Sequence, residues 1–179
     1  SNFAINSLKG IFDYYSINVN RKVAYKIKKQ IKCYIKRKET RKTMSQPIAI
    51  IDCNNFYASC EQAIDPEARG NPVVVLSNND GVIIALSNEA KAVGLEKFTP
   101  VFKVKHLLDK HSVKIFSANF QLYAYKSQQI MDILRNYSPD VEEYSIDEAF
   151  VGLGGFSRFD LTEYATRIRK DILAQTGIS

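Results

Sequence analysis

The sequence predicts a mixed fold of helices and strands (α/β, in an α+β arrangement), and three observations lead to it. Short runs of β-branched residues alternate with longer segments in which apolar residues recur every three or four positions. Asn, Ser and Gly stand between these segments, where helices begin and turns form. The 179 residues are 45% hydrophobic, which is enough for one modest core.

The first strand is predicted over residues 47–52, and a helix over 56–63 follows it. Asn54 and Asn55 precede this helix as N-cap residues, and a proline and a glycine close it. Residues 73–76 and 82–86 are two β-branched runs, separated by a turn that contains Asp80-Gly81. That spacing predicts a β-hairpin.

The second half of the body continues the alternation of helices and strands. Ser87 or Asn88 is expected to cap a helix that stops at Gly94. The predicted elements are helices over 89–93, 102–108, 120–137 and 161–175, a strand over 114–116 and a hairpin over 142–153. The sequence then stops at residues 177–179, where such a fold would enter another strand, so we expect a truncated chain.

Basic residues are concentrated in the first quarter of the chain. Residues 1–43 hold twelve Lys and Arg against two Asp and Glu, whereas residues 44–179 hold thirteen against seventeen. Apolar residues at four-residue spacing predict a basic amphipathic helix over 23–35. This extension is either a non-native leader, disordered or helical, since the chain begins with Ser and Met44 precedes the first strand, or an arm that binds nucleic acid or an acidic surface.

Several classes of protein are disfavoured by what the sequence lacks. No apolar run is long enough to span a membrane, and no signal peptide is visible. Cys33, Cys53 and Cys60 show no CxxC spacing, so we expect reduced thiols in a cytoplasmic protein. The motifs of serine hydrolases, P-loop proteins and zinc proteases do not occur.

Three carboxylates stand in two strand-like segments far apart in the sequence. Asp52 ends the first apolar run, and Asp147 and Glu148 lie in the later hairpin. If the two strands are neighbours, the acids converge and require a counter-charge, usually divalent metal ions. Two metals held by carboxylates catalyse phosphoryl and nucleotidyl transfer. Taken singly, each acid is more simply read as a solvated turn or capping residue.

A phosphate site is predicted beside the first strand. The helix that begins near Phe56 and Tyr57 points its free N–H groups and its dipole at whatever lies next to Asp52, and a triphosphate suits that position. Lys91 could add a positive charge there, although alone it would be an ordinary surface lysine. His106 and His111 have no acidic or Cys partner at ligand spacing, so we expect them to be structural or exposed.

Four segments resemble, in order, the motifs of Y-family lesion-bypass DNA polymerases. They are residues 51–61, 73–81, 88–94 and 144–150. The run Leu76-Ser77-Asn78-Asn79-Asp80-Gly81 and the Asn after Cys53 resemble the UmuC type, the catalytic subunit of bacterial DNA polymerase V. The likeness spans residues 46–179, and residues 1–43 have no counterpart in it.

The resemblance implies a domain arrangement. Residues 44–55 and 119–179 would form an incomplete polymerase palm, a ferredoxin-like sheet with helices on one face. Residues 56–118 would form a small fingers subdomain. The thumb and little-finger domains would be absent.

The resemblance also implies a role for each site residue. Asp52, Asp147, Glu148 and the backbone carbonyl of Cys53 would bind two Mg²⁺ ions. The nucleotide would be bound by Asn54, Asn55, Phe56, Tyr57, Asn88 and Lys91. Tyr57 would be the steric gate that excludes a ribose 2′-hydroxyl. Asn88 and Lys91 stand where many members carry Tyr and Arg, and a lysine lacks the bidentate fork of arginine.

The implied function is template-directed deoxynucleotidyl transfer in translesion synthesis, DNA repair and the SOS response, weak or lost in this chain alone. The implied partners are primer-template DNA, deoxynucleoside triphosphates, a processed UmuD-type accessory subunit and a recombinase filament, with no membrane. An exposed sheet edge would favour self-association. Two alternatives stay open: a non-catalytic interaction module that uses the basic arm, and a metal-dependent nucleotidyl cyclase.

Overall fold

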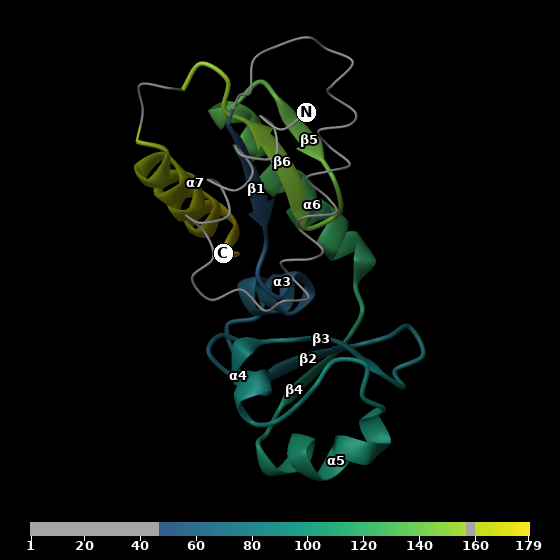
Figure 1. Ribbon diagram of the computed structural model, residues 1–179. Helices are drawn as coiled ribbons and strands as arrows, with labels where there is room; N and C mark the ends of the chain where they lie inside the picture. Colours follow the sequence, from purple (N-terminus) through teal and green to yellow (C-terminus); the bar gives the residue numbers. More distant parts are fainter. Residues whose placement is uncertain (1–46, 157–159) are drawn as a thin grey trace, which may run out of the picture. The chain divides into compact units, whose positions relative to one another are not determined.

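The computed structural model describes residues 47–156 and 160–179, which hold two three-stranded sheets and five helices (Figure 1). The predicted mixed fold is confirmed. The basic extension over 1–43 and its predicted helix lie outside the described residues. No helix in the described part of the chain is both long and apolar enough to cross a membrane.

The first sheet brings the start of the described chain against a late hairpin. It contains β1 (Ile48–Asp52), β5 (Val141–Glu143) and β6 (Glu148–Gly152) in the order β1-β6-β5, with both pairs antiparallel. Ile48 lies opposite Gly152, and Asp52 lies opposite Glu148. Two segments about a hundred residues apart are therefore direct neighbours.

The second sheet has the order β3-β2-β4. β2 (Val73–Leu76) and β3 (Ile83–Leu86) are antiparallel, which agrees with the predicted hairpin. In the turn between them Asp80 adopts a positive φ of 51°, a conformation that Asp tolerates better than most residues. β4 (Lys114–Ser117) pairs parallel with β2, which requires the long crossover between them.

Three of the five helices in the described part of the chain have a side-chain cap at their start. The five helices are α3 (Phe56–Ile64), α4 (Asn88–Ala92), α5 (Val101–Lys110), α6 (Phe120–Tyr137) and α7 (Leu161–Thr176). The hydroxyl of Ser87 accepts from the amide of Ala90, and Asn119 caps α6 in the same way. Gly177 ends α7 with a φ of 75°, a left-handed conformation that suits glycine. α5 is longer than predicted by one residue at its start and two at its end.

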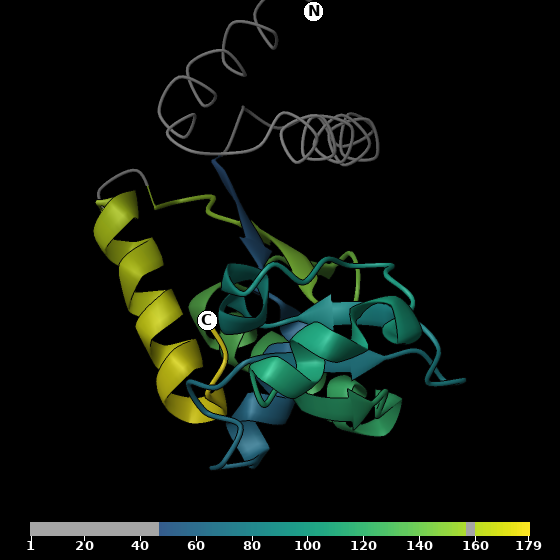
Figure 2. The ribbon, with the colours of Figure 1, turned by 90° about the horizontal axis from the view of Figure 1, so that it is seen from below.

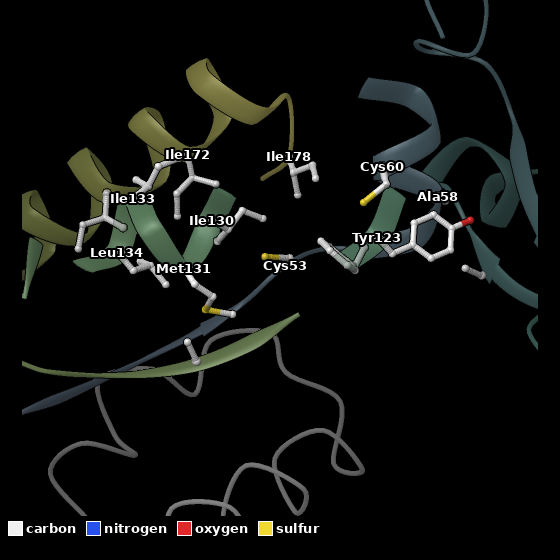
Figure 3. Close-up of a cluster of buried hydrophobic side chains, with 14 of the residues drawn as sticks. Cys53, Ala58, Cys60, Tyr123, Ile130, Met131, Ile133, Leu134, Ile172 and Ile178 are labelled. Atoms are coloured by element: carbon white, nitrogen blue, oxygen red, sulfur yellow. The ribbon is translucent and has the colours of Figure 1, made fainter. Parts of the chain in front are cut away.

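One hydrophobic core connects the two sheets. Ala149 and Val151 of β6 pack with α6 and α7, where Ile130, Leu134 and Ile172 are buried (Figure 3). The same core continues through α3 to three small residues of the second sheet, Val73, Val75 and Ala85. The chain after α7 turns back from the helix end (Figure 2), and the amide of Asn54 donates to the carbonyl of Ser179 at 2.9 Å.

The other face of β2 belongs to a second, smaller core. Val74 and Leu76 pack there with Leu108 of α5. All four residues of β2 are buried, so this strand is covered on both faces. That burial explains why the strand reads as an unbroken apolar run rather than as an alternating one.

Candidate metal and nucleotide site

The ends of β1 and β6 bring the predicted acids together. Asp52 and Glu148 are directly opposite each other in the antiparallel pair, so their side chains lie on the same face of the sheet. Asp147 precedes Glu148, and its carbonyl accepts the amide of Cys53 at 3.0 Å. The register thus places three carboxyl-bearing residues at one corner of the first sheet.

A serine hydroxyl connects two of these acids at the tip of the hairpin. The amides of Tyr144 and Ser145 both donate to the carbonyl of Glu148, at 2.9 and 3.1 Å, which closes a tight turn. The Ser145 hydroxyl lies 2.8 Å from Oδ1 of Asp147 and 3.1 Å from Oε2 of Glu148. Sequence reasoning missed Ser145, because a hydroxyl in a hairpin tip carries no pattern of its own.

The charges of Asp52 and Asp147 act on the same small region. Burial, then the charge of Asp147 and then that of Asp52, raises the pKa of the Cys53 thiol to about 12. Burial and then the charge of Asp147 also raise the pKa of Tyr57. Asp147 is therefore an electrostatic neighbour of Cys53, which follows β1, and of Tyr57 on α3.

The donor set at this corner is chemically suited to a hard divalent cation. Carboxylate and carbonyl oxygens are the protein ligands that Mg²⁺ and Ca²⁺ prefer. Among residues 47–156 and 160–179, no three His, Cys, Asp or Glu side chains stand close enough together to form a metal site as they lie. The oxygen donors fit the ion by type and by register, and rotation of the carboxylate side chains would be needed to gather them.

Asn55 joins the start of α3 to α4. It occupies the N-cap position with a φ of 50°, but its side chain does not cap α3. Instead its Nδ2 donates to Oδ1 of Asn88 at 2.9 Å, and its Oδ1 accepts from Nζ of Lys91. The prediction that an asparagine precedes the helix is confirmed, whereas the expected capping bond is wrong because α4 engages both ends of the amide.

The predicted phosphate ligands surround this junction. Lys91 is exposed on α4, and burial followed by the nearby charge of Lys97 lowers its pKa. The amide of Asn54 is engaged by the carbonyl of Ser179, which leaves those of Asn55, Phe56 and Tyr57 at the start of α3. The first N–H groups of a helix have no partner within the helix.

An aromatic cluster surrounds Tyr57, the half-buried second residue of α3. Its ring is stacked on that of Tyr123 from α6, with centroids 4.4 Å apart and planes 13° apart. Phe120 meets both rings edge-on at 5.9 Å. Sequence reasoning placed Tyr57 at the site but missed these two supporting rings.

A family model described as the impB/mucB/samB family matches residues 51–179. Among curated proteins, the chain is 46% identical to Protein UmuC of Salmonella typhimurium strain LT2 and 42% identical to Protein ImpB of Salmonella typhimurium, each over 132 residues. Each match covers 73% of this chain and 31% of the relative. A DNA polymerase IV of Dehalococcoides mccartyi is 34% identical over 133 residues, covering 72% of this chain and 34% of the relative. The chain thus spans about a third of the length of these proteins.

Solved structures share the fold. DinB from Sulfolobus solfataricus matches with a TM-score of 0.66 and 24% sequence identity, covering 74% of this chain and 40% of that one. A structure described as the insertion ternary complex of Dbh DNA polymerase matches equally well. At this level of identity the likeness establishes a common fold.

Proposed function

The chain belongs to the impB/mucB/samB family, and we propose that it forms the nucleotide-handling part of a UmuC-type, Y-family translesion DNA polymerase. The observation that carries the proposal is the register of β1 against β6, with Asp52 opposite Glu148 and Asp147 beside it. This corner adjoins the start of α3, so the three carboxylates lie next to a helix N-terminus of the kind that binds anions.

The two sheets would belong to different polymerase subdomains. In this proposal residues 44–55 and 119–179 form the palm, which contains the β1-β6-β5 sheet. Residues 56–118 form the fingers, which contain the β3-β2-β4 sheet. The division is supported by the second core, which β2 and α5 make within the proposed fingers alone.

Asp52, Asp147, Glu148 and the carbonyl of Cys53 would hold two Mg²⁺ ions. When bound, such ions lower the pKa of an attacking hydroxyl and neutralise charge on the transferred phosphate and its leaving group. The chain's own contribution is to orient the carboxylates. Ser145 contributes to this, because its hydroxyl lies within hydrogen-bond distance of both Asp147 and Glu148.

The triphosphate would lie at the start of α3, against the amides of Asn55, Phe56 and Tyr57 and the ammonium of Lys91, with Asn88 alongside. Asn55 would orient Lys91, since its side-chain oxygen accepts from that ammonium. Lys91 offers a point charge rather than a bidentate fork, so it would neutralise the phosphates more than align them. The ring of Tyr57 would occupy the space that a ribose 2′-hydroxyl needs, which favours deoxynucleotides.

The proposed partners follow from the family. They are primer-template DNA and deoxynucleoside triphosphates, with a UmuD-type accessory subunit and a recombinase filament, in the cytoplasm during the SOS response. Self-association of this chain through a sheet edge is a further expectation. Contacts with the phosphate backbone dominate affinity for nucleic acid. A chain that spans about 31% of the UmuC relative has fewer residues to make such contacts, so we expect only weak primer extension from it.

The test is a titration of the chain with dATP in the presence of Mg²⁺. We expect Asp147→Ala to lose Mg²⁺-dependent binding of dATP, because one of the proposed ligands is removed. Asp132→Ala is the matched control, since this exposed acid of α6 pairs with Arg135 and is none of the proposed ligands. Equal, Mg²⁺-dependent affinities in the parent chain and both variants would contradict the proposal.

A second candidate function is favoured by charge. Residues 1–43 carry twelve bases and two acids, which is typical of an arm that binds nucleic acid. On that interpretation, deletion of residues 1–43 abolishes DNA binding while Asp52→Ala leaves it unchanged. Filter binding of a primer-template duplex to the two variants distinguishes the candidates.

A further inference from the structure

The ring of Tyr57 lies against a tyrosine that is itself held in place. Tyr123 is fully buried, and the face of its ring covers the ring of Tyr57. Phe120 closes the edge of this pair. Stacked aromatic rings attract each other, and the hydroxyl of a buried tyrosine usually makes a hydrogen-bonding contact as well.

Glu61 supplies such a contact. The hydroxyl of Tyr123 donates to Oε1 of Glu61 at 2.7 Å, between α6 and α3. Tyr57 and Glu61 are four residues apart on α3, so they lie on one face of this helix. Both residues therefore contact Tyr123: Tyr57 covers the face of its ring, and Glu61 accepts a hydrogen bond from its hydroxyl (Figure 3 shows Tyr123 beside α3).

The buried hydrogen bond between Glu61 and Tyr123 costs desolvation free energy that a purely structural contact would not need. Glu61 is only 4% exposed, and burial raises its pKa, although the bond from Tyr123 opposes this rise. Burial also raises the pKa of Tyr123, so its hydroxyl keeps the proton that it donates. An apolar pair of similar volume would fill the space without removing a carboxyl group from water. What the polar pair adds is direction, because a hydrogen bond fixes where the ring of Tyr123 can sit.

From this geometry we infer that Glu61 and Tyr123 are positioning residues for sugar selection: the buried carboxyl group fixes the tyrosine on which the Tyr57 ring rests. The inference rests on the proposed function of Tyr57 as the residue that excludes a 2′-hydroxyl. Selectivity of this kind depends on a side chain held within a fraction of an ångström by the residues behind it. Glu61 and Tyr123 touch neither nucleotide nor metal in this account and act only through Tyr57.

The experiment compares dATP with ATP. Affinity of the full 179-residue chain for each nucleotide is measured with Mg²⁺, and the ratio of the two affinities is the readout. We expect Tyr57→Ala to abolish the preference for dATP. Tyr123→Phe and Glu61→Ala should lower it about threefold to tenfold, less than the roughly 10²-fold that a full 1 Å misplacement costs. Glu61→Gln should retain it, because the amide oxygen still accepts from the tyrosine.

The matched control is Tyr137→Phe, which removes a second tyrosine–carboxylate bond, that of Tyr137 to Asp171. Tyr137 ends α6, fourteen residues or about 21 Å of helix from Tyr123. Its removal should leave the dATP-to-ATP ratio unchanged. A purely structural role for Glu61 would weaken both affinities together and leave the ratio as it was.

The outcomes separate this inference from the function beneath it. If the parent chain binds dATP and ATP equally, the proposed role of Tyr57 fails and the inference falls with it. If Tyr57→Ala abolishes the preference but Tyr123→Phe and Glu61→Ala retain it, the inference alone is overturned. Should Glu61→Ala fail to fold, the double variant Glu61→Leu with Tyr123→Phe replaces it, since an apolar pair keeps the packing while removing the bond.

Discussion

Asn55 combines a conformational and a bonding role in one residue. Its φ of 50° is a left-handed conformation that Asn adopts more readily than most side chains. Its amide engages Asn88 and Lys91 on α4. The residue therefore shapes the turn after β1 and fixes the lysine proposed to meet the triphosphate.

These two roles separate in a pair of substitutions. Asn55→Gly permits the left-handed backbone but removes both side-chain bonds, whereas Asn55→Ala removes the bonds and adds strain. We expect both variants to lose affinity for Mg²⁺-dATP, and the alanine variant to be about 1–2 kcal/mol less stable than the glycine variant. Nucleotide titration and urea unfolding measure the two effects. Parent-like dATP affinity in Asn55→Gly would count against the role of Asn55 in orienting Lys91.

Sequence reasoning identified the acids but not their supports. Asp52 and Asp147 could be predicted because Asp52 ends the apolar run of β1 and Asp147 comes immediately before the apolar strand β6. Glu61 and Tyr123 could not, since their partnership joins positions 62 residues apart. Within its own helix Glu61 looks like any solvent-facing acid, and burial is a property of the packed chain.

At the scale of elements, strand β6, which pairs antiparallel with β1, ends at a glycine. Gly152 donates its amide to the carbonyl of Asp140 at 2.7 Å and accepts from the hydroxyl of Ser138 at 2.6 Å. A methyl group at Gly152 would overlap the Cβ and carboxylate of Asp140. The glycine is needed here for space and not for an unusual φ.

We expect Gly152→Ala to destabilise the protein by about 1–3 kcal/mol, because the end of β6 or the Asp140 loop must move. Gly81→Ala is the control, since a methyl there would make only an ordinary contact, 3.8 Å from the carbonyl of Asn79. Its cost should stay within about 0.5 kcal/mol. Denaturant unfolding of both variants measures the difference, and equal free energies of unfolding would refute the packing argument.

Individual elements were easier to predict than their pairing. α6 was predicted over 120–137 and has those bounds, because Asn119 caps its start and Ser138-Pro139 stops it. The parallel pairing of β4 with β2 was not predicted, because periodicity within a strand does not identify its neighbour. The register that places Asp52 opposite Glu148 likewise came only from the structure.

At the scale of the whole described unit, the larger of the two cores contains residues of both sheets, which predicts one cooperative unfolding transition. Cys53 and Cys60 lie in this core with residues of both sheets, and Cys60 is fully buried. We expect iodoacetamide not to react with either thiol while the chain is folded at pH 8.5. Both thiols should be modified only when the chain unfolds globally, and therefore at the same rate. Peptide mapping by mass spectrometry measures this for each thiol separately. Rapid labelling of Cys60 alone would show that α3 opens independently of the rest.

The same burial makes stability depend on pH. Burial and neighbouring charges raise the pKa of the Cys53 thiol from 9.0 to about 12. Because the folded state holds this proton more tightly than the unfolded state, the stabilisation is complete below pH 9.0 and is lost as the pH rises toward about 12. Cys53→Ala should therefore show a smaller loss of stability over this range than the parent chain, measured by thermal melts at each pH. An unchanged pH dependence in that variant would contradict the assignment.

The most direct test of the account is to count Mn²⁺ ions bound to the chain by electron paramagnetic resonance, with dATP present in excess. If the acids of β1 and β6 form one cation site, Asp52→Asn and Asp147→Asn each lower the number of tightly bound Mn²⁺ ions, while Asp132→Asn leaves it at the parent value. Equal Mn²⁺ binding by the parent chain and all three variants would contradict the claim that these two strands share a metal site.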